Sequence, residues 1–153
     1  MLNFFRKKAA DFFTTEEKQI ITNAIKASEK NTSGEVRIFV ESKCKFVHAV
    51  DRAEEIFAQL KMYETVQRNA VLIYVALKDR QLAVYGDKGI HEKVGTAFWN
   101  EEVKQMIQFF NKENYAQGIA TVAQQIGDAL ALHFPYCKVT DENELSDDIV
   151  FGH

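Results

Sequence analysis

The chain has 153 residues, of which 46% are hydrophobic and 27% charged, and its formal net charge is −3. This length suits one domain with a full hydrophobic core, and the composition excludes disorder over most of the chain. The small net charge, with both signs mixed along the sequence, implies no broad basic face. It argues against nucleic acid as the main partner and gives no electrostatic reason to bind an anionic membrane.

The two cysteines, Cys44 and Cys137, form no CxxC pair and have no histidine at zinc-finger spacing. A structural zinc site is therefore not expected. Two reduced thiols are typical of a cytoplasmic protein, which is the location that we predict.

Residues 1–13 are interpreted as an amphipathic segment that precedes the domain. Two phenylalanine pairs, at 4–5 and 12–13, flank a stretch with three consecutive basic residues, Arg6, Lys7 and Lys8. This order is not that of a signal peptide, and the longest uncharged apolar run, residues 69–77, is too short to span a bilayer. We expect the phenylalanines to pack onto the domain, and weak contact with a membrane surface is the alternative.

The first half of the chain predicts two helices and three strands. A capping box from Thr14 to Glu17 begins a helix that ends near residues 30–34. Alternation over residues 35–41 predicts a strand, and a helical stripe follows at residues 53–60. Residues 70–76 form a continuous apolar run, which is typical of a strand buried on both faces. A turn at residues 77–80 then leads into a return strand at 81–85, which residues 86–89 end.

Two further helices are predicted from apolar stripes at residues 99–110 and 119–130, and Pro135 closes the second. The strand–helix–strand unit implies a parallel pair, to which the hairpin adds an antiparallel strand. We therefore predict a three-layer α/β/α sandwich around a small mixed sheet, with the domain at residues 14–136. Residues 137–153 read as an acidic tail that could fold back through its apolar residues, Leu145, Ile149, Val150 and Phe151.

These segments resemble the TPM domain family, in its short bacterial branch without a signal peptide or transmembrane tail. The order and spacing of several short motifs carry the resemblance, which runs from about Phe12 to the C-terminus. The motifs are residues 32–36 and 51–53, the strand at 68–76, Asp79-Arg80, residues 85–90, Phe98-Trp99, residues 115–118 and 133–136, and the tail at 141–145 and 149–152.

The resemblance implies a mixed sheet between helix layers. It also implies phosphatase chemistry, which is assigned to some members, and binding of divalent metals such as calcium, which is associated with some. Many secreted relatives carry an acidic residue where this chain has Arg68. That difference removes a potential metal ligand.

The predicted topology brings polar residues together at one edge of the sheet, where the first two strands begin and the third ends. Glu35 and Asp87 would supply carboxylates for Ca²⁺ or Mg²⁺, with Asn69 as an amide ligand. Arg68 beside them could hold a phosphate or carboxylate, so Arg68 and Asn69 are the predicted cofactor-binding pair. The simpler alternative is a salt bridge between Arg68 and one of the acids.

The opposite edge is the alternative site, because ligands of open α/β sheets bind outside the carboxyl ends of parallel strands. It is expected to collect four polar residues from the first strand, the second helix and the hairpin turn: Ser42, Asp51, Asp79 and Arg80. The simpler reading is a helix cap at Asp51 and an ordinary turn at Asp79-Arg80.

Three functions follow from these patterns. The first is a module that binds a divalent cation, Ca²⁺ above all, or another partner, without robust catalysis. The second is a metal-assisted phosphomonoester hydrolase, in which Glu35 and Asp87 hold the metal and Arg68 stabilises the phosphoryl oxygens. The third is a stress-related or assembly-related domain that binds a protein partner through its N-terminal segment.

Overall fold

A computed structural model describes residues 8–136 and 149–153 of the chain. Its sheet has four strands, in the order β3-β2-β1-β4. Strands β1 (Glu35–Glu41) and β2 (Ala70–Ala76) are parallel, and β3 (Gln81–Gly86) returns antiparallel to β2. The predicted mixed sheet is therefore confirmed, with the strand order that the sequence implied.

The fourth strand, β4 (Val150–Phe151), comes from the region interpreted as a tail. It lies parallel to β1, where Val150 pairs with Phe39 and Phe151 with Val40. The chain thus folds back onto the sheet through two of the apolar residues that the sequence singled out. Leu145 and Cys137 lie outside the described residues.

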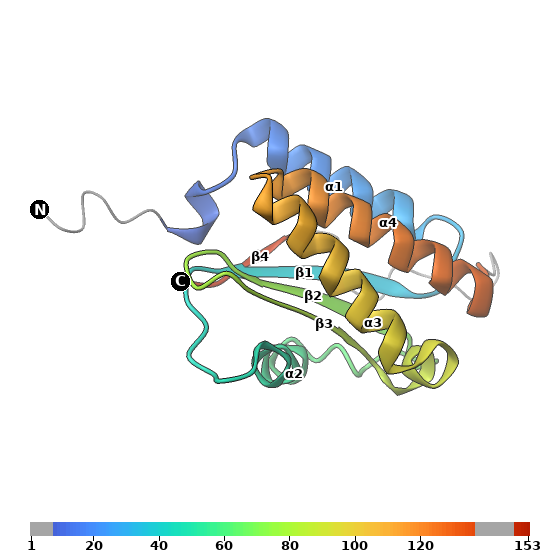
Figure 1. The fold of residues 1–153 in the computed structure, drawn as a ribbon. Coiled ribbons are helices and arrows are strands. Elements are labelled where there is room, and N and C mark those ends of the chain that lie inside the picture. Colours follow the sequence, from blue (N-terminus) through green and yellow to red (C-terminus); the bar gives the residue numbers. More distant parts are fainter. Residues whose placement is uncertain (1–7, 137–148) are drawn as a thin grey trace, which may run out of the picture.

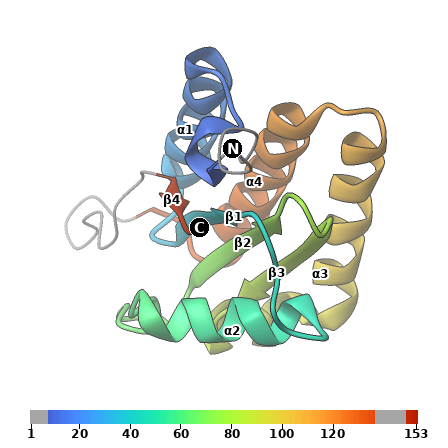
Figure 2. The same ribbon diagram turned by 90° about the vertical axis from the view of Figure 1, so that its left-hand side faces the viewer.

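Helices cover both faces of the sheet, so the three-layer sandwich is also confirmed (Figure 1). Helices α1 (Thr15–Glu29), α3 (Lys88–Asn111) and α4 (Tyr115–His133) lie on one face, and α2 (Ala49–Gln59) lies alone on the other (Figure 2). Alternation within each strand separates the two cores. In β1, Val36, Ile38 and Val40 face the three-helix layer, whereas Phe39 faces α2.

Local signals account for the helix ends. The capping box is present, because Thr14 Oγ1 accepts the Glu17 N–H at 3.1 Å and Glu17 Oε1 accepts the Thr14 N–H at 2.9 Å. Helices α1 and α4 approach closely at Gly127, where an added Cβ would lie 2.6 Å from Ser28 Cα. Such a contact requires glycine at this position.

Helix α3 differs from the sequence prediction. The apolar stripe indicated a helix from Trp99, but the helix already begins at Lys88, with Asp87 as its N-cap. Gly95, at φ 78°, breaks it between the two parts. The glycines on both sides of Lys88 suggested a turn, and Gly95 interrupted the helical pattern, which hid the first part of the helix.

The described part of the N-terminal segment packs on the domain, as predicted. A short 3₁₀ helix, η2 (Ala9–Asp11), buries Ala9, and Phe13 is buried in the core below the three helices. Phe4 and Phe5 lie outside the described residues. In the part of the chain that the structure describes, no helix combines the length and apolarity needed to cross a membrane.

Candidate functional site

The amino edge of the sheet brings together the four residues that the sequence predicted there. Glu35 aligns with Ala70, the residue after Asn69, and its N–H donates to the Asn69 carbonyl at 3.3 Å. On the other side of β2, the Asp87 N–H donates to the Ala70 carbonyl at 2.9 Å. Glu35, Asn69 and Asp87 thus follow one another across three strands.

Arg68 and Asp87 form a bidentate ion pair at this edge. Arg68 donates from Nε to Asp87 Oδ2 at 2.7 Å and from Nη2 to Oδ1 at 2.8 Å. These hydrogen bonds raise the pKa of the Arg68 guanidinium. Asp87 Oδ1 also accepts the Lys88 N–H at 2.7 Å, which caps α3. Both carboxylate oxygens are therefore occupied by donors from the chain.

Two buried polar groups complete the amino edge. Asn69 is 1% exposed, and its amide nitrogen donates to Ser33 Oγ at 3.1 Å. Its Oδ1 is buried and has no hydrogen-bond donor in the structure. Glu35 is buried as well, at 3% exposure. Asn69 Oδ1 can therefore accept a water or a small cation.

The Asp87 carboxylate, as its side chain lies, is not free to bind a cation at this edge. Asp87 is engaged by a guanidinium, and Arg68 brings a positive charge to the place where the cation would bind. Among residues 8–136 and 149–153, no three histidine, cysteine or acidic side chains gather closely enough to hold a metal.

The opposite edge of the sheet does not gather its four predicted residues around one centre. Asp79 Oδ2 accepts the Cys44 N–H at 2.9 Å, which ties the hairpin turn to the loop after β1. Asp51 is exposed in the first turn of α2, and Arg80 is exposed in the hairpin turn. Ser42 alone of the four lines a large hollow at this edge.

This hollow has a volume of about 1080 Å³ and opens at the carboxyl ends of β1 and β2. Helix α2 packs mainly against β3 and β2 and lies little against β1, next to which β4 pairs at the edge of the sheet. The hollow is bordered by η2, the end of β1 with its following loop, α2, the β2–β3 turn and residues 152–153. We call it the carboxyl-edge hollow.

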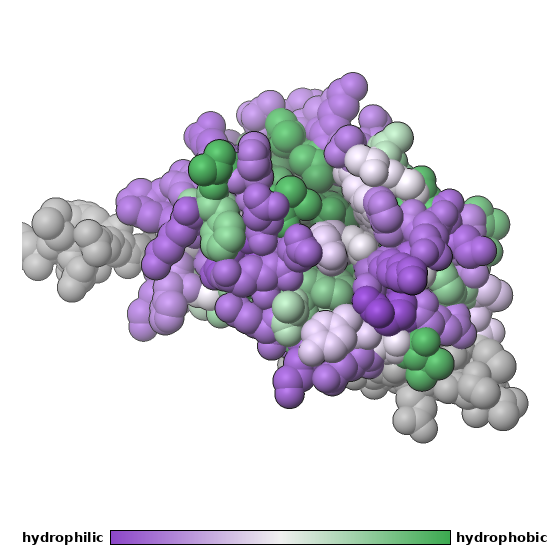
Figure 3. All heavy atoms as spheres, turned by 90° about the horizontal axis from the view of Figure 1, so that it is seen from below, coloured by the Kyte–Doolittle hydropathy of each residue, from purple (hydrophilic) through white to green (hydrophobic). Residues whose placement is uncertain are grey.

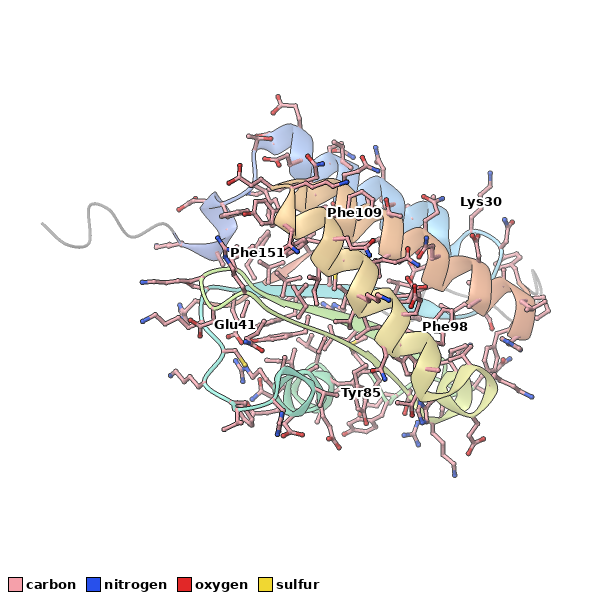
Figure 4. All side chains as sticks on the ribbon, viewed as in Figure 1. Lys30, Glu41, Tyr85, Phe98, Phe109 and Phe151 are labelled. Atoms are coloured by element: carbon pink, nitrogen blue, oxygen red, sulfur yellow. The ribbon has the colours of Figure 1, made fainter. Side chains whose placement is uncertain are left out.

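A buried network forms one wall of the carboxyl-edge hollow. Arg52 donates from Nε to Glu41 Oε2 and from Nη2 to Glu41 Oε1, both at 2.9 Å, and its Nη1 pairs with Glu55. The Tyr74 hydroxyl donates to Glu41 Oε2 from within the sheet. Figure 4 labels Glu41 at the end of the sheet where Phe151 also lies.

The network shifts two pKa values. The hydrogen bonds that it donates to Glu41 raise the pKa of the Arg52 guanidinium, so it stays charged. Burial, together with the hydrogen bond to Glu41, raises the pKa of the Tyr74 hydroxyl, so it stays protonated and donates. Sequence analysis missed this network. The available signal was a glutamate at the end of an alternating strand, followed by an arginine in the first turns of the next helix.

The surface around α2 is mixed in character. Figure 3, which views the molecule from below, shows hydrophobic side chains in patches among hydrophilic ones. Among the described residues, the exposed apolar side chains near α2 include Phe46, Val47 and Val50. Phe46 lines the carboxyl-edge hollow and lies 6.0 Å below the Arg52 guanidinium, in cation–π contact.

Two other groups outside the hollow have clear structural partners. His91, in the first turn of α3, accepts a hydrogen bond at Nδ1 from Trp99 Nε1 at 2.9 Å. Glu102, which sequence analysis did not mark, is buried in α3, and the side-chain amide of Gln125 on α4 lies 2.7 Å from its Oε2. Burial and the nearby charge of Glu101 raise its pKa to about 7.

The helices on both faces of a four-stranded mixed sheet define a small α/β domain. The model of the TPM domain matches residues 7–129, and the chain belongs to the TPM family. The search of curated proteins found no match.

Solved structures agree with this assignment. The BA42 protein of the psychrophilic bacterium Bizionia argentinensis is 40% identical, with a TM-score of 0.83 over 92% of this chain and 96% of that one. The N-terminal domain of cg2496 from Corynebacterium glutamicum is 13% identical, with a TM-score of 0.62 over 78% of this chain and 74% of that one. An N-terminal domain from P. gingivalis is 14% identical, with a TM-score of 0.66 over 84% of each chain. The last two show the fold alone.

Proposed function

We propose that this TPM domain is a ligand-binding module without robust catalysis, and that the carboxyl-edge hollow is its binding site. The observation that carries the proposal is a hollow of about 1080 Å³ at the carboxyl ends of two parallel strands. Open α/β sheets bind their ligands at this edge. The volume lies just above the range of roughly 300–1,000 Å³ that is usual for small-molecule sites.

The wall of the hollow is suited to binding because it is fixed before a ligand arrives. Glu41 is held from two sides, by Arg52 and by Tyr74, and Arg52 is also held by Glu55. A site whose side chains are already paired loses little conformational entropy on binding.

A fragment screen followed by ¹⁵N NMR tests the proposal. Fragments of neutral, cationic and anionic character should produce shifts that cluster at Ser42, Phe46 and Gly152. Gln59 lines the hollow and is exposed, so Gln59→Trp should fill part of it and weaken binding. Gln108→Trp, at an exposed position on α3, is the matched control. The proposal fails if no fragment of any class shifts the residues of the hollow.

A divalent cation at the amino edge is the second candidate. The buried Asn69 Oδ1, which lacks a donor, favours it, and Glu35 begins the neighbouring strand at the same edge. The cation would have to bind next to the Arg68–Asp87 ion pair or displace Arg68 from it. Titration with Ca²⁺ and then Mg²⁺ should shift Gly34, Glu35 and Asn69 saturably, and unchanged spectra would exclude this candidate.

The phosphatase alternative is tested on the same samples with p-nitrophenyl phosphate. Turnover that is abolished both by a chelator and by Asp87→Ala would favour metal-assisted hydrolysis over a binding module. Binding to a protein partner through the N-terminal segment is tested by deleting residues 1–7, which leaves the buried Ala9 and Phe13 in place.

A further inference from the structure

The charged groups that line the carboxyl-edge hollow fall into two sets. Both carboxylates among the described lining residues, Glu41 and Glu55, are paired with Arg52. Four exposed lysines are also present, and no salt bridge holds any of them within the described parts of the chain: Lys8, Lys43, Lys45 and Lys78.

The difference between the paired carboxylates and the lysines without salt bridges favours an anionic ligand over a cationic one. A cationic ligand would meet carboxylates whose charge Arg52 already balances, whereas an anion would meet lysines that form no salt bridge with the described residues. Among the described residues that line the hollow, five side chains are basic and two are acidic. The described lining of the hollow is therefore basic.

Three of the lysines come from segments that are fixed to each other. The Leu77 N–H donates to the Glu41 carbonyl at 2.9 Å, and the Lys78 N–H donates to the Ser42 carbonyl at 2.7 Å. These hydrogen bonds hold the β2–β3 turn, which carries Lys78, against the beginning of the loop that carries Lys43 and Lys45. The cations therefore converge from two tethered segments on one rim.

The interior beyond this rim is apolar. Aromatic and aliphatic side chains from η2, β1, α2 and the two loops line it: Phe12, Phe39, Phe46, Ile56 and Leu77. An inorganic anion would leave the more exposed of these side chains, Phe12, Phe46 and Leu77, in contact with water. A ligand with an apolar body beside its charge would cover them and gain roughly 25 cal/mol for each Å² of apolar surface buried.

We infer that the carboxyl-edge hollow binds a small amphipathic organic anion, with its carboxylate or phosphate at the Lys43–Lys45–Lys78 rim and its apolar body against Phe39 and Phe46. This inference rests on the proposed function, because it assigns a ligand class to the same site. The long, flexible lysine side chains suit either kind of acidic head group, because an ammonium acts as a point charge.

Three amphiphiles that share a ten-carbon chain separate the contribution of charge from that of apolarity. Decanoate, 1-decanol and decyltrimethylammonium are titrated below micelle-forming concentrations and followed by ¹⁵N NMR. We expect decanoate to bind at least tenfold more tightly than the other two, with shifts at Ser42, Phe46 and Gly152. Its affinity should fall as salt is added, because the lysines at the rim are exposed to solvent.

Variants of the lysines then test whether the rim binds the charged head group of decanoate. The triple variant Lys43→Gln, Lys45→Gln, Lys78→Gln should lose at least tenfold in decanoate affinity and leave decanol binding unchanged. The control replaces three exposed lysines on the opposite layer, Lys26, Lys93 and Lys104, with glutamine and should bind decanoate like the wild type.

The inference is overturned if decanol or the cationic amphiphile binds the hollow as tightly as decanoate. It is also overturned if both triple variants lose affinity equally, or if the chain binds anionic lipid vesicles but not monomeric decanoate. The first two results leave the hollow as a binding site and reject only the ligand class. In the vesicle case, the fragment screen decides whether the hollow binds any ligand. Absence of binding by all three amphiphiles, together with a failed fragment screen, would reject the proposed function itself.

Discussion

The buried carboxyl group of Glu102 should make the stability of this domain depend on pH. Glu102 is 4% exposed, and its pKa in the folded state is raised to about 7 from a reference value of 4.5. The cause is burial first, and then the charge of Glu101. The folded chain therefore binds more protons than the unfolded chain between about pH 4.5 and pH 7.

The sign of the effect follows from this difference in bound protons. The free energy of unfolding must fall as pH rises through that window, and the loss is complete above it. A difference of about 2.5 pKa units corresponds to about 3 kcal/mol, since each unit is about 1.36 kcal/mol. The stabilising contribution is present below the unfolded pKa and is lost as Glu102 ionises.

The substitution Glu102→Gln isolates this effect, because glutamine keeps the shape of the side chain and cannot ionise. The variant should be more stable than the wild type by about 1 kcal/mol at pH 5 and about 3 kcal/mol at pH 8. Urea denaturation at both pH values measures the two differences, and contributions from other titrating groups cancel between the two proteins. Glu101→Gln, at an exposed neighbouring position, should change stability by less than about 0.5 kcal/mol. A stability difference for Glu102→Gln that does not vary with pH would refute the reasoning.

Three further predictions concern other parts of the fold. Glu41→Gln weakens the pairing with Arg52 and should lower the free energy of unfolding, measured by urea denaturation, by about 2–3 kcal/mol. A loss below about 0.5 kcal/mol would show that the network contributes little to stability. Gly127→Ala places a Cβ 2.5 Å from Ser28 Cβ and should lower the free energy of unfolding by about 1–3 kcal/mol, which a lower Tm would show. An unchanged Tm would mean that α1 and α4 can move apart at little cost. Arg68→Gln removes the guanidinium from Asp87 and should increase the Ca²⁺ affinity of the amino edge at least tenfold, as measured by NMR titration. Equal affinities of the variant and the wild type would show that the guanidinium does not compete with the cation.

Much of the fold could be predicted because its strands and helix caps are encoded locally. The expected bounds of β1 and β2, residues 35–41 and 70–76, are those of the structure. A strand buried on both faces leaves a continuous apolar run, and a capping box needs only four residues. By contrast, Gly95 interrupts the pattern of α3, and a two-residue strand such as β4 leaves too short a pattern to recognise.

The same distinction between local signals and tertiary packing explains which parts of the candidate sites could be predicted. The neighbours at the amino edge could be predicted because strand order and register determine which residues of β1, β2 and β3 are adjacent. The ion pair between Arg68 and Asp87 was the simpler of the two alternatives for that edge. The carboxyl-edge hollow could not be predicted, since it depends on how far α2 lies from β1 and on where residues 152–153 return. Glu102 is buried by packing between helices, which its sequence neighbours do not reveal.

The pairing of β4 with β1 bears on the order in which the domain assembles. Phe39 and Val150 are over a hundred residues apart in the chain, so their pairing closes a long loop around most of the domain. The Ser42 N–H also donates to the His153 carbonyl at 2.9 Å, which closes the hollow on that side. During synthesis on the ribosome, α1, β1, α2 and the hairpin can assemble while the border of the hollow is still incomplete. Phe39 would stay partly uncovered through that interval, and a nascent chain arrested before residue 150 should be recognised by chaperones that bind exposed aromatic side chains.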